Sequence, residues 1–159
     1  MEAKSTDSKT FQLTENGLLL GELVYENLFF LKAEIILPNT EQYKIEPIGI
    51  FQTYLSVTKN GLAFAKLKMN WSGQIVFSFI DGQEFVFKSK GFIHNNFSIE
   101  NEEQEKLIQF NPTFNWSKSN YNYEISYNKV LQDTLLVLLG IYASNYYIAC
   151  MSGANTGMT

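Results

Sequence analysis

The chain has 159 residues, a net charge of −4, and 12 lysines but no arginine. This length fits one domain with a full hydrophobic core. The negative charge argues against a general nucleic-acid binder, because phosphate contacts need a basic surface. The absence of arginine excludes any site that holds a carboxylate or a phosphate through a guanidinium fork.

Two features bear on where the protein resides. Residues 1–8, MEAKSTDS, contain no apolar stretch and do not resemble a signal peptide, so we expect a disordered lead before a domain that spans residues 9–151. Cys150 is the only cysteine, which rules out an internal disulfide and favours a reducing compartment. The sequence therefore predicts a cytoplasmic protein, and peripheral association with a membrane is compatible with this prediction.

From residue 9 to residue 128 the chain alternates β-branched and aromatic runs with turn residues, and no helical period interrupts them. About twelve strands are expected, at residues 10–14, 18–25, 29–37, 42–46, 51–58, 62–70, 74–79, 83–89, 96–99, 106–110, 113–117 and 121–127. Short turns make successive strands antiparallel, and twelve strands in one sheet tend to close or split. The pattern predicts a mostly β protein built as a closed antiparallel barrel.

Four glycine turns, at residues 15–17, 59–61, 71–73 and 80–82, allow the strand register to be predicted. With three-residue loops, the last three of these hairpins keep their apolar side chains on one face, whereas two-residue loops would place Lys68 opposite Phe77. The expected cross-strand pairs are Leu55 with Ala65, Val57 with Ala63, Leu67 with Phe77, Met69 with Ile75, and Phe77 with Phe85.

A single helix is predicted at about residues 129–150, followed by a flexible tail at 152–159. Asn128 can cap this helix, and Asp133 suits its positive end. The segment is apolar nearly all round, so it either lies buried on every side or spans a bilayer.

Several residues favour burial over a bilayer. Ser144 and Asn145 are polar positions in the middle of the segment, and Lys129 is its only basic flank. A barrel of about twelve strands leaves a lumen that side chains alone do not fill, and a helix is ~10–12 Å wide. Small inward residues would give the helix room, namely Gly21, Ala63 and Ala65. We expect a central apolar helix; a membrane anchor and a helix packed outside an open barrel remain the alternatives.

The closing segment YEISYNKVLQDTLLVLLGIYASNYYIAC, with Asp133 just before the apolar run, resembles the end of tubby C-terminal-like domains. That group includes tubby domains, LURP-one-related proteins and phospholipid scramblases, and this chain looks like a bacterial member. The resemblance covers residues 9–151 and implies a non-enzymatic binding or scaffold module. The proline-rich lead, cysteine cluster and calcium segment of scramblases are absent, so lipid translocation is not implied.

The resemblance also implies a place to look for a ligand, because tubby domains bind phosphoinositide head groups through surface cations. The candidates here are Lys66, Lys68, Lys88 and Lys90, on outward positions of adjacent hairpins. The predicted register places Glu84 beside this patch, where it offsets part of the charge. We expect weak, salt-sensitive attachment to anionic head groups, and an ordinary solvated surface is the alternative.

No catalytic, metal or cofactor site is expected. His94 is the only histidine and lies in a predicted loop, and Cys150 is expected to be buried at the end of the apolar segment. The acidic run with Glu100, Glu102, Glu103 and Glu105 lacks the glycine and aspartates of a calcium loop, so a solvated turn is favoured. The sequence predicts a non-enzyme without cofactor.

The partner is expected to be a protein or an anionic lipid head group, and the oligomeric state is left open. Two other functions remain: a tail-anchored membrane protein with a cytoplasmic β domain, and a lipocalin-like carrier of a small ligand. The position of the apolar helix distinguishes the three, because it would lie in the lumen, in a bilayer or outside the barrel.

Overall fold

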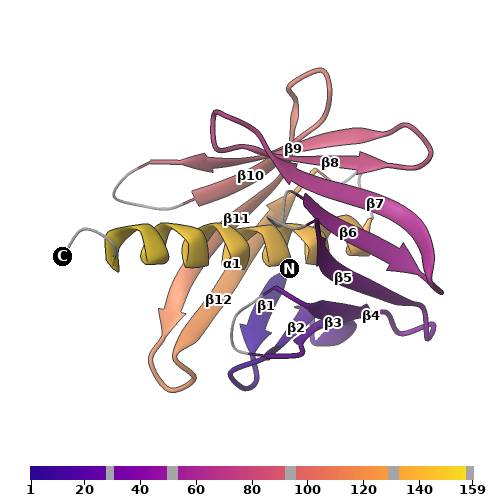
Figure 1. Cartoon of the computed structure of the whole chain (residues 1–159). Helices are drawn as coiled ribbons and strands as arrows, with labels where there is room; N and C mark the ends of the chain where they lie inside the picture. The colour runs from indigo at the N-terminus through magenta and orange to yellow at the C-terminus, as the bar shows by residue number, and fades with distance from the viewer. Residues whose placement is uncertain (28–30, 50–53, 92–95, 129–132, 157–159) are drawn as a thin grey trace.

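The computed structural model describes residues 1–27, 31–49, 54–91, 96–128 and 133–156, with side chains described as far as Ser152. Within these residues, twelve antiparallel strands form a closed barrel around one helix (Figure 1). The strands are β1 (Glu2–Ser5), β2 (Thr10–Glu15), β3 (Leu18–Tyr25), β4 (Ala33–Ile36), β5 (Gln42–Ile48), β6 (Tyr54–Lys59), β7 (Leu62–Met69), β8 (Ile75–Phe79), β9 (Glu84–Lys90), β10 (Asn96–Glu100), β11 (Lys106–Asn115) and β12 (Asn120–Tyr127). The predicted closed barrel is confirmed.

The barrel has the simplest up-and-down order, in which each strand pairs with its neighbours in the sequence. Closure comes from β1, which pairs with both β2 and β12 and places Ala3 opposite Tyr123. Side chains alternate between lumen and solvent along each strand; on β1, Ala3 and Ser5 are buried while Glu2 and Lys4 are exposed. The predicted disordered lead at residues 1–8 is therefore wrong, because β1 completes the barrel.

A second difference concerns β11, which is one strand where two were predicted. Pro112 suggested a break, yet β11 continues through it and pairs Pro112 with Tyr123 of β12. The pairing of β11 with β10 extends only to Phe110. Pro112 thus lies where β11 has a described neighbour on one side, and such edge positions tolerate a residue without an N–H.

The turn between β6 and β7 differs from the predicted three-residue loop. Both Asn60 and Gly61 have positive φ, 52° and 76°, which makes a two-residue turn. A β-bulge follows, so Val57 lies opposite Ala65, while Ala63 is exposed and does not face the lumen as expected. The expected pairs of Leu55 and Val57 are wrong. The β7–β8 and β8–β9 pairs were predicted correctly.

The helix, α1, runs from Thr134 to Thr156 and begins later than predicted. Asp133 is its N-cap, since its Oδ1 accepts a hydrogen bond from the backbone N–H of Leu136 at 3.1 Å. Asn128 is not at the start of the helix, which begins at Thr134, and its backbone N–H donates to Leu107 O at 2.8 Å and prolongs β12. The predicted flexible tail is wrong as far as residue 156, because the helical backbone continues to that point.

The first half of α1 lies inside the barrel, where every residue from 135 to 145 is buried (Figure 1). Two glycines mark its closest approaches to the wall. A Cβ on Gly21 of β3 would lie 2.8 Å from Leu138 Cδ1, and a Cβ on Gly140 would lie 2.1 Å from Phe110 Cζ. Such distances leave no room for an added methyl group. The predicted central helix is confirmed.

Polar residues of the helix have partners on the barrel wall or in the helix. Tyr123 OH donates to Asn145 Oδ1 at 2.6 Å, and Asn145 Nδ2 donates to Tyr25 OH at 3.1 Å. Ser144 Oγ donates to Gly140 O at 2.8 Å. By length and composition the segment Thr134–Ser152 resembles a membrane span, but 61% of it is buried in the barrel. The hydrogen bonds from Asn145 to Tyr123 and Tyr25 fix the position of the helix relative to the barrel wall.

Because turns of an up-and-down barrel alternate, its two ends carry different turns. We call the end where α1 begins the proximal end; it carries the β2–β3, β4–β5, β6–β7, β8–β9 and β10–β11 turns. The distal end carries the other turns, and there the C-terminal part of α1 leaves the barrel (Figure 1). Its residues become partly exposed from Tyr146 onward, and Met151 is half exposed.

Candidate functional site

The four candidate lysines do not form one continuous patch. Lys66 and Lys68 are exposed on the outer face of β7, and Lys90 is exposed at the last position of β9. Lys88 is only partly exposed, because its ammonium pairs with the carboxylate of Glu100 on the neighbouring strand β10. That ion pair leaves Lys66 and Lys68 as the cations best placed for an external ligand.

Lys66 and Lys68 border a groove of about 650 Å³ on the outer surface of β7 and β8. The apolar part of its lining comes from Met69, Trp71 and Val76, and Trp71 is fully exposed in the β7–β8 turn. The groove thus places two positive charges beside an apolar and aromatic surface, which is the arrangement that an anionic amphiphile would match.

The charges at this groove are only partly offset by the protein itself. Lys66 Nζ lies 4.3 Å from the ring centroid of Tyr54, a cation–π contact that orients it. In the part of the chain that the structure covers, neither Lys66 nor Lys68 pairs with a carboxylate. Glu84 is the nearest acid in the register, and Ser78 Oγ donates to its Oε2 at 2.9 Å. The predicted position of Glu84 beside the patch is confirmed, because Lys66 lies opposite Ser78 and Ser78 lies opposite Glu84.

The β7–β8 turn presents Trp71 to solvent because Asn70 satisfies the polar groups around it. Asn70 Oδ1 accepts hydrogen bonds from the N–H and the hydroxyl of Ser72, at 3.1 and 2.9 Å, and from the N–H of Gln74 at 3.0 Å. This Asx turn fixes the backbone locally. Gly73, with φ 77°, completes it. Trp71 is therefore held in place by its neighbours without packing of its own ring.

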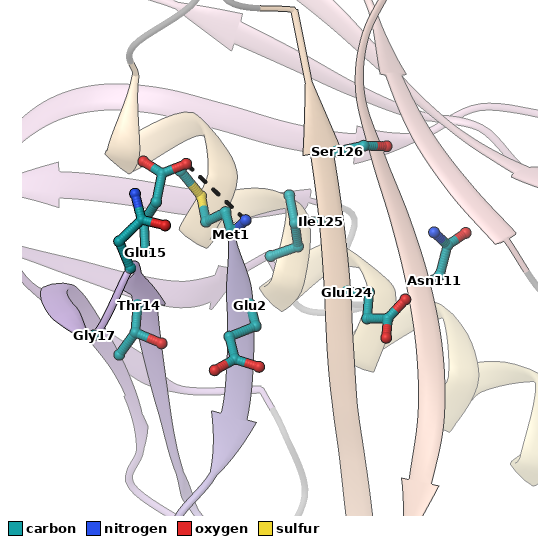
Figure 2. A pocket seen from close by; sticks show the side chains of 10 residues that line it. Met1, Glu2, Thr14, Glu15, Gly17, Asn111, Glu124, Ile125 and Ser126 are labelled. Carbon is teal, nitrogen blue, oxygen red and sulfur yellow. Dashed lines mark ion pairs between the residues drawn. The ribbon is translucent and has the colours of Figure 1, made fainter.

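A second pocket, of about 470 Å³, opens at β1, β2 and β12 and is acidic (Figure 2). Glu2 lies directly opposite Glu124 in the register. Lys4 pairs with Glu2 at 2.9 Å, and the Met1 amine lies 4.0 Å from Glu15, as the dashed line in Figure 2 marks. The protein's own cations thus engage two of these three acids. In the described ranges no three His, Cys, Asp or Glu side chains are placed to hold a metal ion.

Of the residues considered for catalysis, the structure describes Cys150 but not His94. The prediction that His94 lies in a loop falls outside the described residues. Cys150 is exposed and not buried as expected, because the buried part of α1 ends at Asn145. Glu102, Glu103 and Glu105 lie in an exposed turn, as expected. The same expectation is wrong for Glu100, which is buried at the end of β10 and pairs with Lys88. That neither His94 nor Cys150 carries a catalytic activity stays a prediction.

One unexpected group on the outside of the sheet is Ser98. It lies directly across from Lys88, and its hydroxyl is buried without a hydrogen-bond partner among the described residues. A serine beside a lysine resembles the nucleophile and base of some hydrolases. However, Ser98 is only 2% exposed, and Glu100 already engages Lys88. The hydroxyl is closed to a substrate in this conformation.

No protein-family model matches the chain, and no curated protein or solved structure shows significant similarity to it. The closed barrel around a C-terminal helix is therefore supported by the structure alone. The residue that sequence reasoning missed is Trp71, which was counted with the turn and not as a surface feature. Its signal was the repeated sequence Asn-Trp-Ser, at Asn70–Ser72 and again at Asn115–Ser117.

Proposed function

We propose that this protein is a non-enzymatic binding module of the tubby-like kind, and that the β7–β8 groove takes an anionic, partly apolar ligand. The observation that carries the proposal is that Lys66 and Lys68 line the same groove as apolar side chains, among them the fully exposed Trp71. A large aromatic side chain in water, beside cations without acidic partners, favours contact with another molecule.

The chemistry of the groove suggests the head group and upper chain of an anionic lipid. Lysine ammonium groups recognise charge more than shape, so Lys66 and Lys68 suit a phosphate that can approach from several directions. The acyl chain or glycerol would then lie along Met69 and Val76, next to the indole of Trp71. A cytoplasmic protein peripheral to the membrane is the location that fits this ligand.

The residues lining the groove argue for binding without turnover. They include no histidine, cysteine, aspartate or glutamate. General acid–base and nucleophilic mechanisms use mainly these side chains, because their pKa values lie near or can be moved near neutrality. The groove therefore offers charge and apolar contact but no evident catalyst.

The test is a titration with a monomeric short-chain phosphatidylglycerol, kept below its micelle concentration. A Trp116→Phe background leaves Trp71 as the single fluorescent indole that reports binding. Each lysine near an anionic group contributes about 1 kcal/mol. We therefore expect Lys66→Gln with Lys68→Gln to weaken binding roughly thirtyfold.

The matched control is Lys44→Gln, an exposed lysine on β5 that lies 3.8 Å from Glu34. It removes a positive charge from the same barrel surface, and we expect it to leave affinity unchanged. Equal affinities for the double variant and the parent, or an equal loss in the control, would show that the groove does not bind this ligand.

A further inference from the structure

The two tryptophans of the chain occupy turns that share the sequence Asn-Trp-Ser and two hydrogen bonds. In each, the asparagine Oδ1 accepts from the N–H and the hydroxyl of the serine two residues later. These distances are 3.1 and 2.9 Å for Asn70 and Ser72, and 3.2 and 2.8 Å for Asn115 and Ser117. Both turns are stabilised without the indole, and Trp116 is 86% exposed where Trp71 is fully exposed.

Both turns lie at the distal end, where α1 leaves the barrel (Figure 1). The part of the helix that projects there carries no charge, and its exposed residues are Ala149, Cys150, Met151 and Ser152. At the β11–β12 turn the exposed aromatic surface includes two rings, because Phe114 packs edge-on against Trp116 with 4.8 Å between the ring centroids. The distal end therefore combines two indoles with an uncharged helix end.

The two ends of the barrel also differ in charge. The described turn residues of the distal end contain three lysines and two acids, namely Lys9, Lys32, Lys118, Asp7 and Glu26. Those of the proximal end contain acids and no lysine, namely Glu41, Asp81, Glu102, Glu103, Glu105 and Asp133. An anionic surface would attract the distal end relative to the proximal end and so orient the barrel.

We propose that the distal end docks on an anionic bilayer, with Trp71, Trp116 and the projecting end of α1 in the head-group region. Indoles prefer this region because they combine a large apolar ring with a polar N–H. The barrel holds residues 135–145, so the helix end reaches the interface without spanning the bilayer. The inference rests on the proposed lipid-binding function, and it brings the groove at Lys66 and Lys68 next to the head groups.

A bilayer explains this end better than a protein partner does. A protein partner would be matched by a particular shape, whereas the two indoles of the distal end lie on separate turns, β7–β8 and β11–β12, with strands β8 to β11 between them in the barrel order. Lysines alone give an attachment that salt weakens over a Debye length of ~8 Å. Inserted indoles add a component that salt does not screen, so attachment should persist at physiological ionic strength.

The experiment is co-sedimentation with vesicles of phosphatidylcholine and phosphatidylglycerol in equal amounts, at ~0.15 M salt. We expect Trp71→Ser with Trp116→Ser to weaken binding about a hundredfold, or about tenfold for each indole. Both indoles are exposed, so the fold is unaffected. The matched control is Leu18→Ser with Leu62→Ser, which removes two exposed apolar side chains, 70% and 73% exposed, from the proximal end. We expect no change in that control.

Each other outcome has a definite meaning. If the wild-type protein does not sediment, or both double variants lose binding equally, the docking proposal is wrong. If monomeric lipid still binds through Lys66 and Lys68 in that case, the proposed function stands alone. If vesicles bind through the tryptophans while monomeric lipid does not bind, the groove function fails and docking stands. If the protein self-associates without lipid and Trp71→Ser with Trp116→Ser abolishes this, the distal end is a protein interface.

Discussion

Gly140→Ala gives the sharpest test of packing between α1 and the barrel. An alanine Cβ at this position would lie 2.1 Å from Phe110 Cζ and 2.9 Å from Ile99 Cδ1. Both neighbours are fully buried on adjacent strands, β11 and β10, so neither can swing into solvent. The methyl group can be accommodated only if the helix or a strand shifts.

Two opposite effects set the size of the change. Alanine is favoured over glycine inside a helix by about 1 kcal/mol, because glycine loses more backbone freedom on folding. An added methyl group in a well-packed core costs about 1–3 kcal/mol, and the short distances to Phe110 place this case at the upper end. We expect a net loss of about 2 kcal/mol in the free energy of unfolding.

Urea unfolding measures this loss directly. With a denaturant dependence of ~1–3 kcal/mol per molar urea, the midpoint should fall by about 1 M. Phe110→Leu is the matched background, because it removes the ring atoms that the new methyl group would meet. In that background Gly140→Ala should cost much less, and the difference is the coupling energy of the pair. If Gly140→Ala raises the midpoint, as it would in a helix facing lipid or water, the packing described here is wrong.

Three further predictions concern the lumen. Leu139→Asp places an unpaired carboxylate at a fully buried position and should abolish cooperative unfolding; a variant that still unfolds cooperatively would contradict burial of this residue. Asn145→Leu should cost about 1–3 kcal/mol by leaving Tyr123 OH without its acceptor, and Tyr123→Phe should restore part of that loss; additive effects would disprove the pairing. Burial raises the pKa of Tyr25 and Tyr123 well above the ordinary 10.0, so the folded protein keeps protons that the unfolded chain releases. Stability should be complete below about pH 10 and fall as the pH rises further, by about 1.4 kcal/mol per unit for each phenol; tyrosinate absorbance that appears before unfolding would refute this.

Much of the fold was predictable from two patterns. Apolar and polar side chains alternate along the strands, which fixes the face that each strand turns to the core, and a helix that is apolar all round must be buried or span a bilayer. Strand β1 was missed because its sequence, Glu-Ala-Lys-Ser, contains no large apolar side chain, although Ala3 faces the lumen. The β6–β7 register was missed for a different reason. A two-residue turn with a bulge keeps Leu55, Val57 and Ala65 inside, as a three-residue loop also does, so alternation cannot distinguish the two.

The candidate site was predicted only in part. The outward positions of Lys66 and Lys68 follow from alternation on β7, and the structure keeps them exposed. The pair of Lys88 with Glu100 depends on the register of β9 and β10, which none of the four predicted glycine turns sets. Trp71 was missed because it was treated only as part of the glycine turn at residues 71–73 and not as an exposed ring. The repeated Asn-Trp-Ser sequence, once at the predicted turn 71–73 and once in the predicted strand 113–117, was the available signal, since an asparagine that caps its own turn leaves the next side chain free.

Thiol reactivity measures most directly whether α1 fills the barrel and then leaves it. Cys150 lies on the exposed part of the helix, whereas Ala143 is fully buried in the lumen. In native buffer without detergent, Cys150 should react with a thiol reagent at close to the rate of the unfolded chain. The thiol of Ala143→Cys, in a Cys150→Ser background, should be protected by about 10³-fold or more, because it reacts only when the barrel opens. Equal reaction rates at the two positions, or protection of the introduced thiol only when lipid is present, would show that the helix does not lie in the barrel.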